Sequence, residues 1–243
     1  MAAHTQEMGG WIRLLVVGAM VFTTWQWLRN WGATAAERQM ALPGDELIGD
    51  PAAMTTLAVP IEAPAADIWP WLLQIGQDRG GFYSYDALEK LVGLHINSAD
   101  QIVDEWQTLT VGDSVRLTPQ GWMGQPDGLV LPVARIEAPR SLVLRESPPS
   151  WPWNAVWSFH VVPTSARSCR LISRSRSERP PIPLRVAGIV GTPVTAAMTR
   201  RMLLGIKARA ERADRLARSA AAGPTAPNPG SKDDPRPRVP QGG

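Results

Sequence analysis

The feature that most limits the possible folds is a change of hydrophobic period along the second half of the chain. Between residues 111 and 178 apolar and polar residues alternate in short runs, which predicts β-strands. From about residue 193 to residue 222 apolar residues instead recur every three or four positions, which predicts one long helix. A strand-like run at residues 54–61 and two shorter helical stripes precede the alternating region. This order predicts an α+β fold with an antiparallel sheet and helices on one face.

The clearest predicted strand covers residues 151–162. Its odd-numbered residues are apolar and include Trp153 and Trp157, whereas its even-numbered residues include Ser158 and His160. The pattern is typical of a half-buried strand with an aromatic inner face. We therefore expect His160 on the exposed face.

The next predicted strand, at residues 170–178, alternates in the same way. Arginines fill one face, and the other face carries Leu171 and the small residues Ser173, Ser175 and Ser177. Small side chains that face the long helix leave volume for a ligand, and their hydroxyls can form hydrogen bonds with it. An edge strand with a solvated serine face is the alternative.

The charges of the chain are unevenly distributed. The net charge is only +3. However, residues 37–113 hold thirteen acidic and three basic residues, whereas residues 114–222 hold seventeen basic and six acidic ones. Two halves of opposite charge can attract each other within one fold. The pattern does not fit a uniformly basic nucleic-acid-binding protein, and we expect no nucleic-acid partner.

The N-terminal region contains an apolar run that ends in tryptophans. Residues 11–31 would form about 30 Å of helix, which is enough to cross a bilayer core. This predicts a single-pass membrane anchor, and the flanking charges favour a cytoplasmic domain. A signal peptide cleaved near the A-x-A pattern at residues 33–35 and an amphipathic helix docked on the domain are the alternatives.

Composition divides the rest of the chain into a domain and a tail. Residues 223–243 are rich in Pro, Gly and charge, so we expect them to be disordered. The predicted organisation is an anchor and linker at residues 1–40, one folded domain at residues 41–222, and the tail.

Three stretches of the domain resemble a known superfamily. They read IEAPAADIWPWLLQIGQDRGGFYSYDALEKL, NSADQIVDEWQTLTVGDSVRL and RRMLLGIKARAE. They are similar to a bacterial branch of the START-like, or SRPBCC, superfamily. The resemblance implies a helix-grip fold, in which a curved antiparallel sheet surrounds a long C-terminal helix with a cavity between them. It implies a hydrophobic ligand but transfers no catalytic residue.

Signatures of catalysis and of metal binding are missing from the sequence. It has no P-loop, no HExxH motif and no Rossmann fingerprint. A single cysteine excludes a disulfide framework, and the three histidines lack ligand spacing. We therefore predict no catalytic residue, no metal ligand and no cofactor.

The loop after the first helix is the richest source of polar groups for a cavity. It holds Arg79 and both tyrosines of the chain, Tyr83 and Tyr85. The hydroxyl groups of such a loop can satisfy buried backbone groups, or they can hydrogen-bond to a ligand at the mouth of a cavity. The predicted ligand-binding residues are Arg79, Tyr83, Tyr85, Trp153, Trp157, Ser173 and Ser175.

The sequence thus favours a membrane-tethered protein that binds a small hydrophobic molecule, such as a lipid, a polyketide or an aromatic compound. An enzyme of cyclase or hydrolase type that uses the same cavity is the second hypothesis. A purely structural protein with a filled core is the third.

Overall fold

The computed structural model describes residue 20 and residues 23–83, 98–122, 126–148 and 152–221, without the side chains of residues 183–191. Tyr85, the second predicted helix and the C-terminal tail lie outside these residues.

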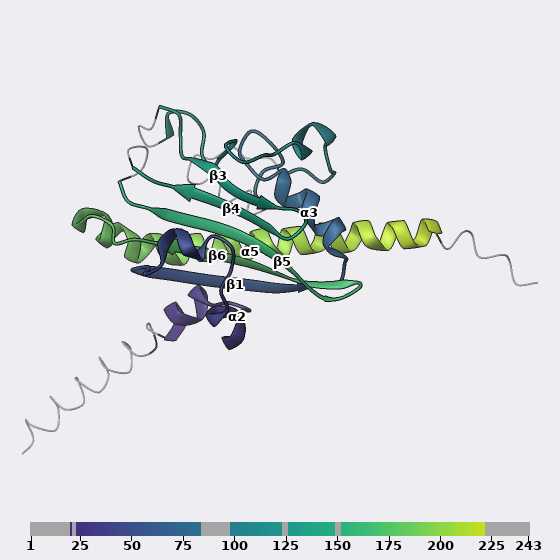
Figure 1. The fold of residues 1–243 in the computed structure, drawn as a ribbon, viewed down its shortest axis with the longest axis horizontal. Helices are drawn as coiled ribbons and strands as arrows, with labels where there is room; N and C mark the ends of the chain where they lie inside the picture. The colour runs from purple at the N-terminus through teal and green to yellow at the C-terminus, as the bar shows by residue number, and fades with distance from the viewer. Residues whose placement is uncertain (1–19, 21–22, 84–97, 123–125, 149–151, 222–243) are drawn as a thin grey trace, which may run out of the picture.

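Six strands form one antiparallel sheet (Figure 1). They are β1 (Ala53–Ile61), β2 (Ser114–Arg116), β3 (Val130–Glu137), β4 (Ser141–Glu146), β5 (Ala155–Ser165) and β6 (Ser168–Ser177). The strand order is β1-β6-β5-β4-β3-β2. β1 is an edge strand, which fits Pro60 because proline cannot donate a ladder hydrogen bond. β6 lies between β1 and β5, so it is not the edge strand of the alternative interpretation.

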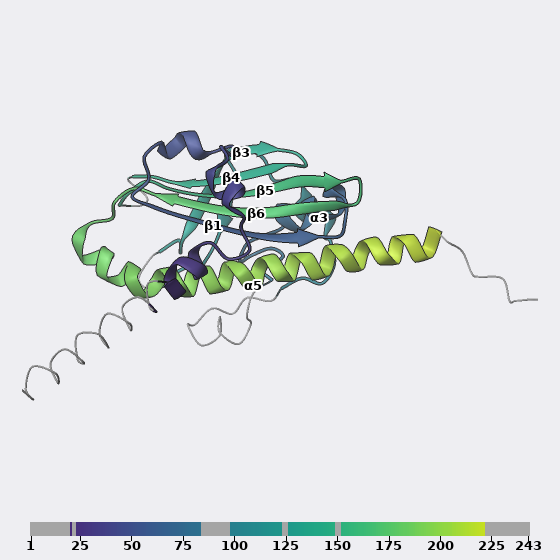
Figure 2. The ribbon, with the colours of Figure 1, turned by 90° about the horizontal axis from the view of Figure 1, so that it is seen from below.

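The two helices α3 (Ala65–Leu73) and α5 (Ile182–Ala221) cover one face of this sheet. The last helix, α5 (Ile182–Ala221), is 40 residues long and begins before the predicted residue 193, with Pro193 inside it. Figure 2 shows that α5 runs along the sheet. α3 (Ala65–Leu73) packs against both α5 and β5. A curved six-stranded antiparallel sheet with a long C-terminal helix fits the helix-grip fold.

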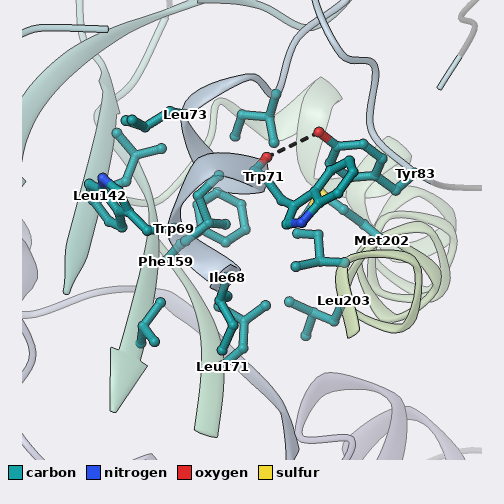
Figure 3. Packing of buried hydrophobic residues seen from close by; sticks show 14 of the residues in the cluster. Ile68, Trp69, Trp71, Leu73, Tyr83, Leu142, Phe159, Leu171, Met202 and Leu203 are labelled. Atoms are coloured by element: carbon teal, nitrogen blue, oxygen red, sulfur yellow. Dashed lines mark hydrogen bonds between the residues drawn. The ribbon is translucent and has the colours of Figure 1, made fainter. Parts of the chain in front are cut away.

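The main core lies between α3, α5 and the sheet face turned toward them, which we call the concave face (Figure 3). Leu142, Phe159 and Leu171 of the sheet are fully buried there, together with Leu72 of α3 and Leu203 of α5. The alternation in β5 and β6 therefore predicts correctly which residues face the helices.

The opposite, convex face of the sheet is covered by residues 31–50, which we call the N-terminal cover. The cover contains α2 (Ala35–Gln39), which begins with a capping box at Thr34, and the 3₁₀ helix η1 (Asp45–Ile48). Figure 2 shows η1 on the side of the sheet away from α5. Ile48 packs on Val143 and Val156 of the sheet.

The cover begins at a close contact with the edge strand. The amide of Ala58 in β1 donates to the Trp31 carbonyl over 3.0 Å. The next residue, Gly32, has φ +70°, and a Cβ there would lie 2.1 Å from the Ala58 carbonyl oxygen. Only glycine allows this turn at this distance. Trp31, the last residue of the predicted anchor, and the predicted linker at residues 32–40 are therefore packed on the domain.

No helix among the described residues is long and apolar enough to cross a membrane. Of the predicted anchor at residues 11–31, the structure describes only residue 20 and residues 23–31.

Candidate functional site

The side chains of the concave face become smaller and more polar toward one end of the sheet. Strand register places them in rows across β1, β6, β5 and β4. The inner row is Leu57, Ser173, Phe159 and Leu142; the middle row is Thr55, Ser175, Trp157 and Leu144; the outer row is Ala53, Ser177, Ala155 and Glu146. The outer row thus holds three small side chains and one acid.

Trp157 is the aromatic wall of this region. Its indole Nε1–H donates to Ser173 Oγ over 3.0 Å, and its ring packs on Phe159 with centroids 4.8 Å apart. Ser173 is 2% exposed, whereas Trp157 and Ser175 are half-buried. The structure therefore brings three of the predicted site residues together.

Glu146 ends β4 on the same face. It is 6% exposed, and no described residue donates a hydrogen bond to its carboxyl or forms an ion pair with it. Burial raises the pKa of this carboxyl to about 7, because a charged acid loses its hydration there. The carboxyl is diagonal to Trp157 across the β4–β5 pair, within reach of a long side chain.

Tyr83 occupies a different part of the core. Its hydroxyl donates to the Trp71 carbonyl over 3.1 Å, and the side chain is 2% exposed. Burial raises the pKa of this phenol above its usual range. A Cβ at Gly205 of α5 would lie 2.4 Å from the Tyr83 carbonyl oxygen, so the loop lies directly on the helix. In Figure 3 Tyr83 lies beside Trp71 and Met202, on the side of the core away from Phe159. The Tyr83 hydroxyl satisfies buried backbone here.

The other predicted residues are placed as follows. Arg79 donates to the Trp106 carbonyl, and burial lowers the pKa of its guanidinium. Trp153 lies in the bend before β5, because the strand begins at Ala155 rather than at residue 151. The strand period therefore does not fix the direction of this indole. Tyr85 is outside the described residues.

The convex face carries a buried polar network centred on Arg174, which is 1% exposed. Its guanidinium donates to Asp45 Oδ2 over 2.5 Å and to the carbonyls of Glu37 and Met40. A fourth bond goes to Thr56 Oγ1. Acidic and carbonyl groups of the N-terminal cover thus surround an arginine of the basic half of the chain.

Other pairs join the two oppositely charged halves in the same way. Arg170 forms an ion pair with Glu37, and Arg209 of α5 forms one with Asp100. Attraction between the halves within one fold accounts for these charges.

The expectation that His160 is exposed is wrong. The residue lies on the predicted face of β5, but it is 2% exposed because the N-terminal cover lies over that face. The ring bonds to Ser141 Oγ through Nδ1 over 3.1 Å and to Ser158 Oγ through Nε2 over 2.9 Å. Burial, followed by the nearby charge of Arg174, lowers the pKa of His160 to about 4.

A hollow of about 290 Å³ lies next to His160, between the cover and β5. Its rim includes Met40, Leu42 and Arg140. The buried polar groups at its base are already bonded to one another, so the hollow offers no unpartnered buried group to a ligand.

Among the described residues, no group of three or more His, Cys, Asp or Glu side chains is placed to hold a metal ion.

Glu146 is not among the predicted site residues, because the alternation of the short strand before it reads clearly only over residues 142–144. Leu142, Leu144 and Glu146 continue the same alternation, so extending the period by two residues places the acid on the inner face. The inward face of β4 therefore carries an acid in addition to its leucines.

Comparison with known proteins gives distant structural similarities. No protein-family model and no curated protein matches the chain. A hypothetical protein from Helicobacter pylori is 11% identical, with a TM-score of 0.44 over 73% of this chain and 99% of its own. A protein from Thermobifida fusca is 20% identical, with a TM-score of 0.40 over 67% of this chain and 94% of its own.

A norcoclaurine synthase from Thalictrum flavum is 18% identical, with a TM-score of 0.39 over 67% of this chain and 96% of its own. Similarities of this size carry no argument about function. The helix-grip architecture stands on the strand order and the long C-terminal helix of the chain itself.

Proposed function

We propose that the chain is a membrane-held protein that binds a small hydrophobic molecule on the concave face, beside Trp157 and the outer row. The supporting observation is the small size of the side chains in the outer row, next to Trp157. Leu57, Phe159 and Leu142 fill most of the inner row, whereas Ala53, Ser177 and Ala155 leave the outer row with little side-chain volume. Trp157 supplies a flat apolar wall, and such sites combine apolar walls with a few polar groups.

Native mass spectrometry of the full chain, purified in lipid nanodiscs, tests the binding proposal. We expect a bound apolar molecule on the wild type and its loss in Ser175→Trp, which fills the middle row. Ser219→Trp, on the exposed end of α5, is the matched control and should retain the molecule. Ala155→Leu is a second blocking variant, to be used if circular dichroism shows that Ser175→Trp is unfolded. Retention of the molecule by a folded blocking variant would refute this location.

An enzyme that uses the same site is the second candidate, and Glu146 is the observation that favours it. A carboxyl whose pKa is near 7 can both accept and donate a proton at neutral pH. If the protein is an enzyme, the bound molecule should change mass during incubation, and Glu146→Gln should slow this change without releasing the molecule. A molecule whose mass never changes argues for binding alone.

The proposed membrane attachment rests on the apolar run at residues 11–31 and places the domain on the cytoplasmic side. Its test must leave the N-terminal cover intact, because Arg174 binds Glu37 and Met40. Replacing Val16 and Val17 with Asp adds about 2.5–3.5 kcal/mol each to the cost of insertion. This variant should move the protein from the membrane to the soluble fraction, whereas Asp at the exposed positions Ala36 and Gln39 should not. Equal fractionation of both variants would exclude the anchor.

A further inference from the structure

Glu146 is a buried acid without a hydrogen-bonding or ion-pair partner among the described residues. Most buried charged groups in proteins are paired, because an unpaired one costs several kcal/mol in lost hydration. Arg174 is buried to a similar extent, and its guanidinium donates hydrogen bonds to four acceptors of the surrounding chain. By contrast, no described group forms a hydrogen bond or an ion pair with the Glu146 carboxyl, although its own strand is regular and fully paired with β5.

The described neighbours of Glu146 in its row across the sheet have small side chains. Its cross-strand partner is Ala155, and the row continues with Ser177 and Ala53, so no large side chain of this row covers the carboxyl. The half-buried Trp157 lies in the next row. Among the described side chains of these two rows, the carboxyl and the indole can therefore contact a bound molecule most strongly.

A carboxylate beside a tryptophan ring selects the charge of its ligand. An ammonium group can form a charge-assisted hydrogen bond with the carboxylate, and the face of an indole attracts cations. A ligand with its own carboxylate would instead place two like charges together in an apolar site. Fatty-acid anions are therefore disfavoured.

We propose that Glu146 binds the basic nitrogen of the ligand, so that the site beside Trp157 takes hydrophobic amines in preference to hydrophobic acids. This inference rests on the proposed function, because it names the ligand class of the same concave site. The polar end of the ligand then lies at the end of β4 rather than at the loop of Arg79 and Tyr83.

Three probes of one shape test this assignment: 1-naphthylmethylamine, 1-naphthylmethanol and 1-naphthoate. Calorimetry at pH 8 uses the full chain in nanodiscs, with empty nanodiscs as the blank. We expect the amine to bind about 10-fold or more tightly than the alcohol, which is the usual size of a hydrogen bond to a charged group. The acid should bind most weakly. This order on the wild type requires no variant.

Glu146→Gln keeps the shape of the side chain and removes its charge. It should weaken binding of the amine by about 10-fold and leave binding of the alcohol within about twofold. Glu105→Gln, at an exposed acid, is the matched control and should change neither value. Equal binding of amine and alcohol by the wild type, or an unchanged amine preference in Glu146→Gln, would overturn the assignment to Glu146 while leaving the binding site in place. If none of the three probes binds the wild type, the proposed function fails together with this inference.

Discussion

Arg174 and Glu146 are both buried charged residues of the sheet. They lie on opposite faces, and of the two only Arg174 has hydrogen-bonding partners among the described residues. Arg174 on the convex face is surrounded by Asp45, Thr56 and two backbone carbonyls. Glu146 on the concave face has no partner among the described residues. The comparison separates structure from function, because a fully paired buried charge holds the fold together and an unpaired one is available to a ligand.

The largest loss in the free energy of unfolding should follow from replacing Arg174, the paired residue of the two. Arg174→Met leaves the carbonyls of Glu37 and Met40 without this donor and removes one of the two arginines that pair with Asp45. The loss of one partner of a buried ion pair costs about 3–5 kcal/mol, so we expect a loss of this size in the free energy of unfolding. Urea denaturation measures it. Arg140→Met, at an exposed arginine, is the control. A loss below about 1 kcal/mol for Arg174→Met would show that the cover is not held by this residue.

Removing Trp157, the aromatic wall of the concave face, should cause the next largest loss in the free energy of unfolding. Trp157→Ala removes a half-buried ring and its hydrogen bond to Ser173. A fully buried ring costs about 3–5 kcal/mol, so the partly exposed Trp157 should cost about 2–3 kcal/mol and the fully buried Phe159 more. Denaturation of the two alanine variants side by side checks the order. If Trp157→Ala costs more than Phe159→Ala, Trp157 is a core residue rather than the wall of a site.

His160 should show a smaller loss on the convex face. His160→Ala removes two hydrogen bonds and leaves the hydroxyls of Ser141 and Ser158 buried without that partner. We expect a loss of about 1–3 kcal/mol in the free energy of unfolding, whereas an exposed histidine would cost less than about 0.5 kcal/mol. Urea denaturation at pH 8 measures this loss. The imidazole of His160 is neutral in both the folded and the unfolded state at this pH, so its ionisation does not contribute.

The last prediction concerns the pH dependence of the free energy of unfolding, to which Glu146 and His160 contribute in opposite directions. The pKa of Glu146 is raised from 4.5 to about 7, so the folded state binds more protons than the unfolded state in this range. Glu146 therefore makes stability fall as the pH rises from about 4.5 to about 7. The pKa of His160 is lowered from 6.5 to about 4, so His160 makes stability fall as the pH drops from about 6.5 to about 4.

Single variants separate these opposing trends. In Glu146→Gln the unfolding free energy should rise more steeply with pH than in the wild type, and in His160→Gln it should rise less steeply or fall. Urea midpoints measured between pH 4 and pH 8 give both slopes. Parallel profiles for the wild type and Glu146→Gln would mean that this carboxyl has the same pKa in the folded and unfolded states.

Much of the fold could be predicted because hydrophobic period reports directly on backbone geometry. Alternation locates β5 and β6 and divides their residues correctly between two faces. It does not reveal what lies on each face, and His160 shows this limit. Its face is polar in sequence, but residues 31–50 cover it, and no local pattern in β5 encodes that contact.

The site was predicted only in part for a related reason. Trp157, Ser173 and Ser175 are close together because strand register follows from alternation. The placement of Tyr83 depends on how its loop meets α3 and α5 through Gly205, which is a tertiary contact. Glu146 could have been found from period alone, but a charged residue at the end of a short strand is more often exposed.

The contact between Trp31 and Ala58 has a consequence for movement. Trp31 is the last residue of the predicted anchor, and its carbonyl already bonds to the edge strand of the sheet. No flexible linker therefore separates the predicted anchor from the folded domain. On the proposal that residues 11–31 lie in a membrane, the domain cannot swing away from the bilayer as a shuttle would, and it meets its ligand at one fixed height and orientation. Exchange would then take place with its own membrane or with a partner that comes to it.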